Sequence, residues 1–152
     1  MLTLGKTESR TLEVAMVAYD HKLLARRFYE EALNTGRLEI LDELLSPSFV
    51  DHGASSEQAP GVEGFKGFLE MITVAFPDLH IQIEDLLAEA DKVAVRLTIC
   101  GTHEGVLMED IPPTGKRATW TGIDVLQFDA GRIVARWSER NLLGLMQQLG
   151  VI

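Results

Sequence analysis

The hydrophobic periodicity of the chain changes once, near Asp78, and this change limits the folds available to it. Before Asp78, apolar residues recur at helical spacing, and after it they alternate with polar residues as in half-buried strands. Helices that are segregated from strands are typical of an α+β domain, whereas alternating helices and strands would indicate a parallel sheet. We therefore expect helices first and a mainly antiparallel sheet second.

The first half of the chain predicts three helices and one short strand. The first helix has no internal proline or glycine, and the turn at Gly36 follows it. The second helix ends at Ser46-Pro47, because a proline disfavours helix in the residue before it. The predicted helices are residues 11–33, 38–45 and 61–76, and the predicted strand is 48–53.

The second half predicts four strands joined by tight turns. Glu89–Lys92 is a plausible hairpin turn, and Gly131 can supply the positive φ that a two-residue hairpin loop needs. One sheet of this length cannot bury its inner face alone, so it must curl around the helices. A cone that encloses a pocket is one solution. The predicted strands are residues 79–87, 93–103, 117–128 and 133–141, and a short helix follows them.

Length and composition indicate a single domain over residues 1–152, with residues 1–12 as an extension that could be flexible. The net charge of −9 disfavours nucleic acid and anionic membranes as partners. The single cysteine, Cys100, suits a reducing compartment, and no apolar run is long enough to span a bilayer. We expect a cytoplasmic protein that has no metal site, because the four histidines lack ligand spacing.

The turn at Ala130-Gly131 predicts how the last two strands pair. If those residues form the loop, Phe128 faces Ile133, and counting back places Asp124 opposite Trp137. Glu139 and Asn141 would then share one inner face with both tryptophans. That face would comprise Trp120, Asp124, Leu126, Phe128, Ile133, Ala135, Trp137, Glu139 and Asn141.

Two carboxylates on an apolar face have chemical interest, because burial raises the pKa of a carboxyl group towards neutrality. Asp124 or Glu139 could then exchange protons with a bound molecule. Two structural alternatives remain open at this point. Glu139 could lie in water at a strand end, and Asp124 could pair with an arginine, for which Arg96 is available.

Two histidines are candidates for a site in the same region. His103 has the same strand parity as Val95 and Ile99, which favours an inward imidazole near the mouth of the cone. The alternative is a hydrogen-bonded histidine at a strand end. His52 follows Asp51 directly, so the two side chains point to opposite faces and do not form a dyad. Either could reach groups on the long strands.

Several segments together resemble the SnoaL-like polyketide cyclase (ester cyclase) family, which belongs to the nuclear transport factor 2-like superfamily of α+β cones. The resemblance extends from about Phe28 to Gly150, and its most specific parts lie in the second half. The segments are SPSFVDHG, FPDLHIQIEDLLAEADKVAVRLTICGTHEG, IPPTGK and TGIDVLQFDAGRIVARWSERNLLGLMQQLG.

The resemblance implies a cone of helices against a curved sheet, a homodimer, and a pocket for a hydrophobic small molecule. In the cyclases that define the family, an acidic residue is the general acid and base of an aldol ring closure that needs no metal or cofactor, and a pocket histidine assists. The residue after W-S-E-R is often aspartate in similar sequences and is Asn141 here. Cyclase chemistry would then rest on Asp124 or Glu139.

Three functions follow from these features. The first is a cofactor-independent cyclase or isomerase acting next to a carbonyl, with Asp124 or Glu139 as base and His103 or His52 on the carbonyl oxygen. The second is a binding protein without catalysis, which Asn141 favours. The third, compatible with both, is a dimer through the outer sheet face. The expected ligand-binding residues are Trp120, Trp137, Asn141, Arg96 and Phe128.

Overall fold

The computed structural model describes residues 5–152 and confirms the expected fold class. Most of the helices precede most of the strands, with β1 between α2 and α3, and the five strands form one open, mixed sheet in the order β1-β5-β4-β3-β2. Only β1 and β5 are parallel, and the other neighbours are antiparallel. The strands are β1 (Leu45–Asp51), β2 (His80–Glu89), β3 (Lys92–Thr102), β4 (Arg117–Asp129) and β5 (Arg132–Arg140).

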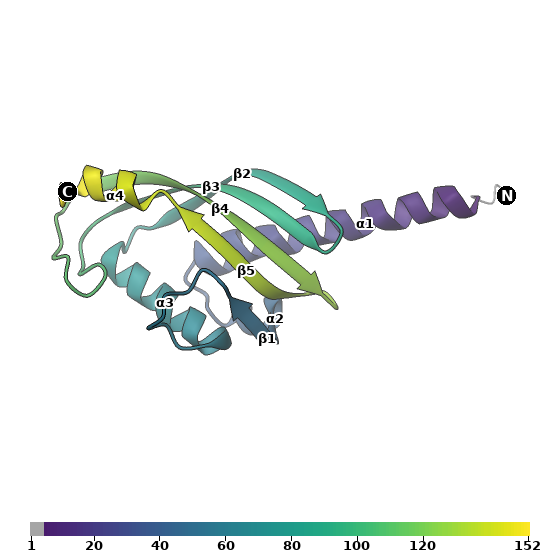
Figure 1. The fold of residues 1–152 in the computed structure, drawn as a ribbon, viewed down its shortest axis with the longest axis horizontal. Helices are drawn as coiled ribbons and strands as arrows, with labels where there is room; N and C mark the ends of the chain where they lie inside the picture. The colour runs from purple at the N-terminus through teal and green to yellow at the C-terminus, as the bar shows by residue number, and fades with distance from the viewer. Residues whose placement is uncertain (1–4) are drawn as a thin grey trace.

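The helices cover the inner face of this sheet and close its ends (Figure 1). The first helix begins at Lys6, within the segment expected as an extension, and its N-terminal part projects beyond the sheet. It continues into a π-helical segment that buries Phe28, Tyr29 and Ala32. The bounds are α1 (Lys6–Arg26), η1 (Arg27–Leu33), α2 (Ile40–Leu44), α3 (Gly61–Ala75) and α4 (Leu142–Leu149).

The core lies between the helices and the inner face of β3, β4 and β5. Phe28 and Phe65 stack at 5.8 Å between ring centroids, and Leu97 and Leu126 are fully buried beneath the helices. Along β4, buried and exposed residues alternate strictly from Arg117 to Gly122, as expected for a strand with one wet face. Across residues 5–152, no helix combines the length and the apolar composition needed to cross a membrane.

The β4–β5 hairpin turns where the sequence predicts, but its register changes after two residue pairs. Ala130 and Gly131 have φ values of 49° and 76°, and Phe128 faces Ile133. The next pair is Gln127 with Ala135, so Val134 is an extra residue in β5. Such a β-bulge reverses the faces of all later residues on its strand.

The predicted inner face of β5 is therefore wrong beyond the bulge. Asp124 faces Ser138 and not Trp137, and Gly122 faces Arg140 and not Glu139. Trp137 and Glu139 lie on the outer face, where the indole is 38% exposed. Arg136, Ser138 and Arg140 replace them inside. The buried face of β4 was predicted correctly, and Trp120, Asp124, Leu126 and Phe128 are all buried.

Deleting Val134 should remove the bulge and turn Arg136 and Arg140 towards water. Asp124 would then be buried without a cation, which costs about 3–5 kcal/mol for a broken buried ion pair. We expect urea unfolding to show a loss of that size, which is a large part of the stability of a domain. Deleting Ser56, in the exposed loop after β1, is the control and should cost far less. Equal stability of the two deletion variants would contradict this role of the bulge.

Candidate functional site

Asp124 lies at the centre of the inner face and accepts hydrogen bonds on both carboxylate oxygens. Tyr29 Oη donates to Oδ2 at 2.6 Å, and Arg136 Nε lies 3.3 Å from the same oxygen. Arg140 donates through Nη1 to Oδ1 at 2.7 Å and through Nη2 to Oδ2 at 3.3 Å. The carboxylate is fully buried, so these donors take the place of its hydration shell.

The second arginine extends this group of side chains to another carboxylate. Arg136 Nη1 donates to Asp51 Oδ1 at 3.0 Å, and its Nη2 donates to Ser138 Oγ at 3.0 Å. Its guanidinium carbon also lies 5.2 Å from the centre of the Phe65 ring, within the range of a cation–π contact. Two carboxylates and two guanidinium groups thus form a buried cluster of zero net charge, hereafter the Asp124 cluster: Tyr29, Asp51, Asp124, Arg136 and Arg140.

The pKa of Asp124 is lowered, contrary to the sequence-based expectation of a raised value. Burial would raise this pKa, but the charges of Arg136 and Arg140 and the hydrogen bonds to the carboxylate outweigh it. Burial and the charge of Asp124 raise the pKa of Tyr29 well above its ordinary value. At neutral pH the pair is therefore a carboxylate and a neutral phenol. Arg96, named as a partner for Asp124, instead pairs with Asp85 on the outer face.

His103 is fully buried at the other end of the inner face, and the inward orientation predicted for it is correct. Its Nδ1 accepts a hydrogen bond from the backbone N–H of Thr114 at 3.2 Å, so in the neutral ring the proton is on Nε2. Within residues 5–152, Nε2 has no hydrogen-bond partner. Trp120 packs on Phe76 at 5.1 Å, and the imidazole packs on the same ring at 5.4 Å.

The structure does not bring His103 and Asp124 together. Trp120 and Asp124 are four residues apart on one strand, a separation of about 13 Å at the rise of a β-strand, and His103 lies beyond Trp120. A buried donor and a buried carboxylate thus lie well apart on the inner face. Within residues 5–152, no group of three or more His, Cys, Asp or Glu side chains is placed to hold a metal ion.

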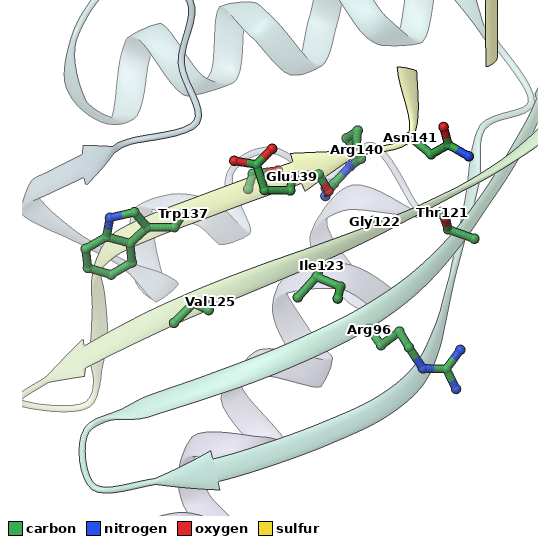
Figure 2. Close-up of a pocket in the computed structure, with 10 residues that line it drawn as sticks. Arg96, Thr121, Gly122, Ile123, Val125, Trp137, Glu139, Arg140 and Asn141 are labelled. Atoms are coloured by element: carbon green, nitrogen blue, oxygen red, sulfur yellow. The ribbon is translucent and has the colours of Figure 1, made fainter. Parts of the chain in front are cut away.

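Several predicted site residues line a groove on the outer face instead (Figure 2). The groove has a volume of about 610 Å³, with Ile123, Val125 and Trp137 as its apolar residues. His52 is exposed and stacks on Trp137 with ring centroids 4.7 Å apart and planes 6° apart. Polar residues also line it: Arg96, Thr121, Ser138, Glu139, Arg140 and Asn141. The sheet separates the outward side chains from Asp124.

Asn141 and Phe128 have structural roles that the sequence reasoning did not assign. The side-chain oxygen of Asn141 accepts from the backbone N–H of Gly144 at 3.0 Å and so caps α4. Phe128 stacks on His21 with centroids 4.6 Å apart, where α1 contacts the end of the sheet. An aspartate at position 141 could form the same cap, so this departure from similar sequences does not by itself concern catalysis.

Sequence reasoning missed four members of the Asp124 cluster. Tyr29 was placed only within the first predicted helix, residues 11–33, and Asp51 was noted only as the neighbour of His52. Arg136 and Arg140 were placed outside by the bulge-free register. Charge balance could have located them, because the predicted inner face carries two acids and no base, an arrangement that burial penalises strongly.

The match to a family model decides which family the chain represents. The model described as "SnoaL-like polyketide cyclase" matches residues 23–149. The chain belongs to this family. Its matched segment includes every member of the Asp124 cluster as well as His103, whereas most of α1 precedes the match.

Solved structures of similar proteins share the fold. TsrD from Streptomyces laurentii is 29% identical, with a TM-score of 0.80, and the match covers 88% of this chain and 97% of that protein. IdmH from Streptomyces antibioticus, a proposed polyketide cyclase, is 32% identical, with a TM-score of 0.74 and coverage of 86% and 98%. AclR from Streptomyces galilaeus, a proposed hydroxylase, is 30% identical, with a TM-score of 0.77 and coverage of 89% and 83%. A comparison with curated proteins gives no match.

Replacing Asn141 tests whether this side chain acts as a helix cap. Asn141→Asp should leave the free energy of unfolding nearly unchanged, because aspartate accepts from the same N–H groups and suits the helix N-terminus. Asn141→Ala should lower it by about 1 kcal/mol. Urea unfolding of the two variants and the wild type measures both changes. Equal losses in the two variants would show that the cap is not the role of this residue.

Proposed function

We propose that this protein binds a hydrophobic ring compound and moves a proton next to its carbonyl group, as in an aldol-type cyclisation or an isomerisation, without a cofactor. The observation that carries the proposal is the buried, ionised Asp124, surrounded by a phenol and two guanidinium groups. Proton abstraction beside a carbonyl needs a base and a group that stabilises the enolate oxygen. The Asp124 cluster contains both kinds of group.

In a ring closure, Asp124 takes the proton from the carbon next to the carbonyl, and the C–H electron pair becomes the double bond of the enolate. An arginine of the cluster stabilises the enolate oxygen. The enolate carbon attacks a second carbonyl, which forms the new C–C bond and an alkoxide. The alkoxide then takes the proton back from Asp124, so the reaction needs no external acid, base or oxidant.

The lowered pKa of Asp124 makes it a weak base in the free protein. It becomes a stronger one when an arginine leaves it for a substrate oxygen, since an opposite charge nearby is what favours the ionised form. The high pKa of Tyr29 keeps the phenol protonated, and its O–H fixes the carboxylate. Trp120 forms an apolar wall, and the free Nε2–H of His103 can donate to a polar group at the far end of a ligand.

The other predicted catalytic residues have no part in this proposal. Glu139 and His52 are exposed on the outer face, and β4 and β5 lie between them and the Asp124 cluster. Trp137 is likewise outside the cone and cannot form a wall of the inner site.

A second candidate function is ligand binding without catalysis, and the hydrogen bonding of Asp124 favours it. The carboxylate already accepts four hydrogen bonds, which satisfies its acceptor capacity. A buried carboxylate with all of its acceptor sites occupied is also expected in an ion cluster whose role is only structural. The two functions differ in whether a bound ketone exchanges its protons.

Proton exchange of a probe ketone separates these functions. With 2-acetonaphthone in D₂O, the wild type should accelerate the loss of the methyl signal in proton NMR, and Asp124→Asn should reduce this acceleration by about 10²–10⁴-fold. Asp51→Asn is the matched control, because Asp51 is a buried partner of Arg136 in the same cluster but does not contact Arg140. Thermal unfolding of both variants checks that they are folded.

Three results are informative. Exchange that needs Asp124 but not Asp51 supports the enzyme. Binding of 2-acetonaphthone by the wild type without faster exchange supports the binding protein. Equal exchange in Asp124→Asn and the wild type overturns Asp124 as the base.

We also infer that the protein forms a homodimer through its outer sheet face. Arg96, Ile123 and Glu139 are paired neighbours on three adjacent strands and form a row of positive, apolar and negative side chains. Neighbouring strands are about 4.8 Å apart, so the two charges are equally far from Ile123. A two-fold axis along the strands over Ile123 would place Arg96 of each copy opposite Glu139 of the other, as an isologous interface requires. Ile123 is 53% exposed and would be buried there.

Charge reversal tests this interface. Arg96→Glu and Glu139→Arg should each weaken the dimer, because like charges then meet across the axis. An equimolar mixture of the two variants should dimerise again, since one mixed pair restores both contacts. Analytical ultracentrifugation measures each sample. A monomeric wild type, or variants that dimerise equally well alone and mixed, would contradict the proposed interface.

A further inference from the structure

Arg140 fills the space that Gly122 leaves on the inner face. A Cβ atom built on Gly122 would lie 2.5 Å from Arg140 Nη1, 2.6 Å from its Cδ and 2.8 Å from the backbone oxygen of Glu139, so any larger residue would collide with the arginine and with the backbone of β5. Along the inner face of β4, this position lies between Trp120 and Asp124. The guanidinium group therefore occupies the place on the sheet beside the proposed base where a substrate would have to lie.

Of the two arginines in the Asp124 cluster, Arg140 is the one that can leave. Arg136 is held by two carboxylates and Ser138, and its side chain is 7% exposed. Within residues 5–152, the hydrogen bonds of the Arg140 side chain go to Asp124 and to the carbonyl oxygen of Glu139, and the side chain is 19% exposed. It stands at the end of β5, next to Asn141, where the chain leaves the sheet (Figure 2).

We propose that Arg140 is a movable plug, and that its rotation towards the end of β5 opens a flat binding site over Gly122. Gly122 would form the floor, Trp120 one wall and Asp124 the opposite end. The guanidinium group is planar, so the slot that it vacates has the thickness of an aromatic ring. The site would take the edge of a fused-ring ketone, with the carbon next to its carbonyl group facing Asp124.

The inference rests on the proposed function and adds the event that activates the base. When Arg140 rotates out, Oδ1 of Asp124 loses its donor at 2.7 Å and becomes free to accept a proton. The same guanidinium group, now at the mouth of the site, can donate to the carbonyl oxygen of the ligand. One rotation thus couples ligand binding to the appearance of a competent base, so that Asp124 stays paired while no ligand is bound.

Naphthalene, which has no polar group, tests the plug by isothermal titration calorimetry. A ligand of the wild type must first break hydrogen bonds between charged groups, a cost that weakens binding by about tenfold or more. Arg140→Ala removes both the plug and this cost, so it should bind naphthalene at least about tenfold more tightly than the wild type. Arg140→Met, which keeps much of the bulk, should gain less.

Equal affinity of the wild type and Arg140→Ala would overturn the inference, as would an equal gain in Arg140→Met and Arg140→Ala. If Arg140→Ala does not fold, arginine-labelled wild type replaces it. Addition of 2-acetonaphthone should then shift the Nε–H NMR signal of Arg140, assigned with Arg140→Lys, and leave that of Arg136 in place. An unmoved Arg140 signal at saturation would overturn the plug.

The two proposals can fail separately. Naphthalene binding needs the slot but no proton transfer, whereas exchange of the ketone protons needs Asp124. Tighter naphthalene binding by Arg140→Ala without exchange of the ketone protons would support the binding site and contradict the proposed catalysis. Exchange that depends on Asp124, without tighter naphthalene binding by Arg140→Ala, would support Asp124 as the base and contradict the movement of Arg140.

Discussion

The buried pairing of Asp124 and Asp51 with Arg136 and Arg140 is the interaction on which the rest of the structure depends. Each ion would be costly to bury alone, and the cluster is tolerable because its charges cancel and its polar atoms are hydrogen-bonded. Its members come from η1, β1, β4 and β5, so the cluster exists only when these elements are assembled. Hydrophobic burial supplies most of the stability, but the ion pairs fix how β5 faces its neighbours.

The sequence predicts the fold well because periodicity reports secondary structure directly. The change near Asp78, the helix predicted over residues 61–76, the long strand from Arg117 and the turn at Ala130-Gly131 all agree with the structure to within about a residue. The candidate site was predicted only in part, because it depends on one residue. Val134 has no local signal that marks it as a bulge: it is a β-branched residue in a strand, as strand propensity favours. The bulge at Val134 can be recognised only by its effect on charged residues, because it turns Arg136 and Arg140 inward.

Burial of Asp124 was therefore predicted correctly, and the direction of its pKa shift was not. An inward acid opposite Trp137 would sit in an apolar environment with a raised pKa, whereas an inward acid opposite Ser138 sits between two arginines with a lowered one. A shift of one residue in one strand thus changes the local electrostatics without changing the fold. For the same reason, similarity of fold within a family does not determine the reaction, and the solved relatives include proposed cyclases as well as a proposed hydroxylase.

The inner face carries two polar groups that differ in how well their hydrogen-bonding capacity is satisfied. Asp124 has every acceptor site occupied, whereas His103 has a buried Nε2–H with no partner within residues 5–152. An unpaired buried donor costs about 1–3 kcal/mol. Thr114 fixes the tautomer that creates this cost, since its backbone N–H occupies Nδ1. Ala118, Trp120 and Gly122 lie between the two groups along β4's inner face, and Gly122 is the position where a side chain is absent and an arginine fills the space. The inner face thus has the polar groups of His103 and Asp124 on either side of an apolar stretch that includes Gly122. This arrangement fits a flat molecule with an oxygen atom at each end better than it fits a continuous apolar core.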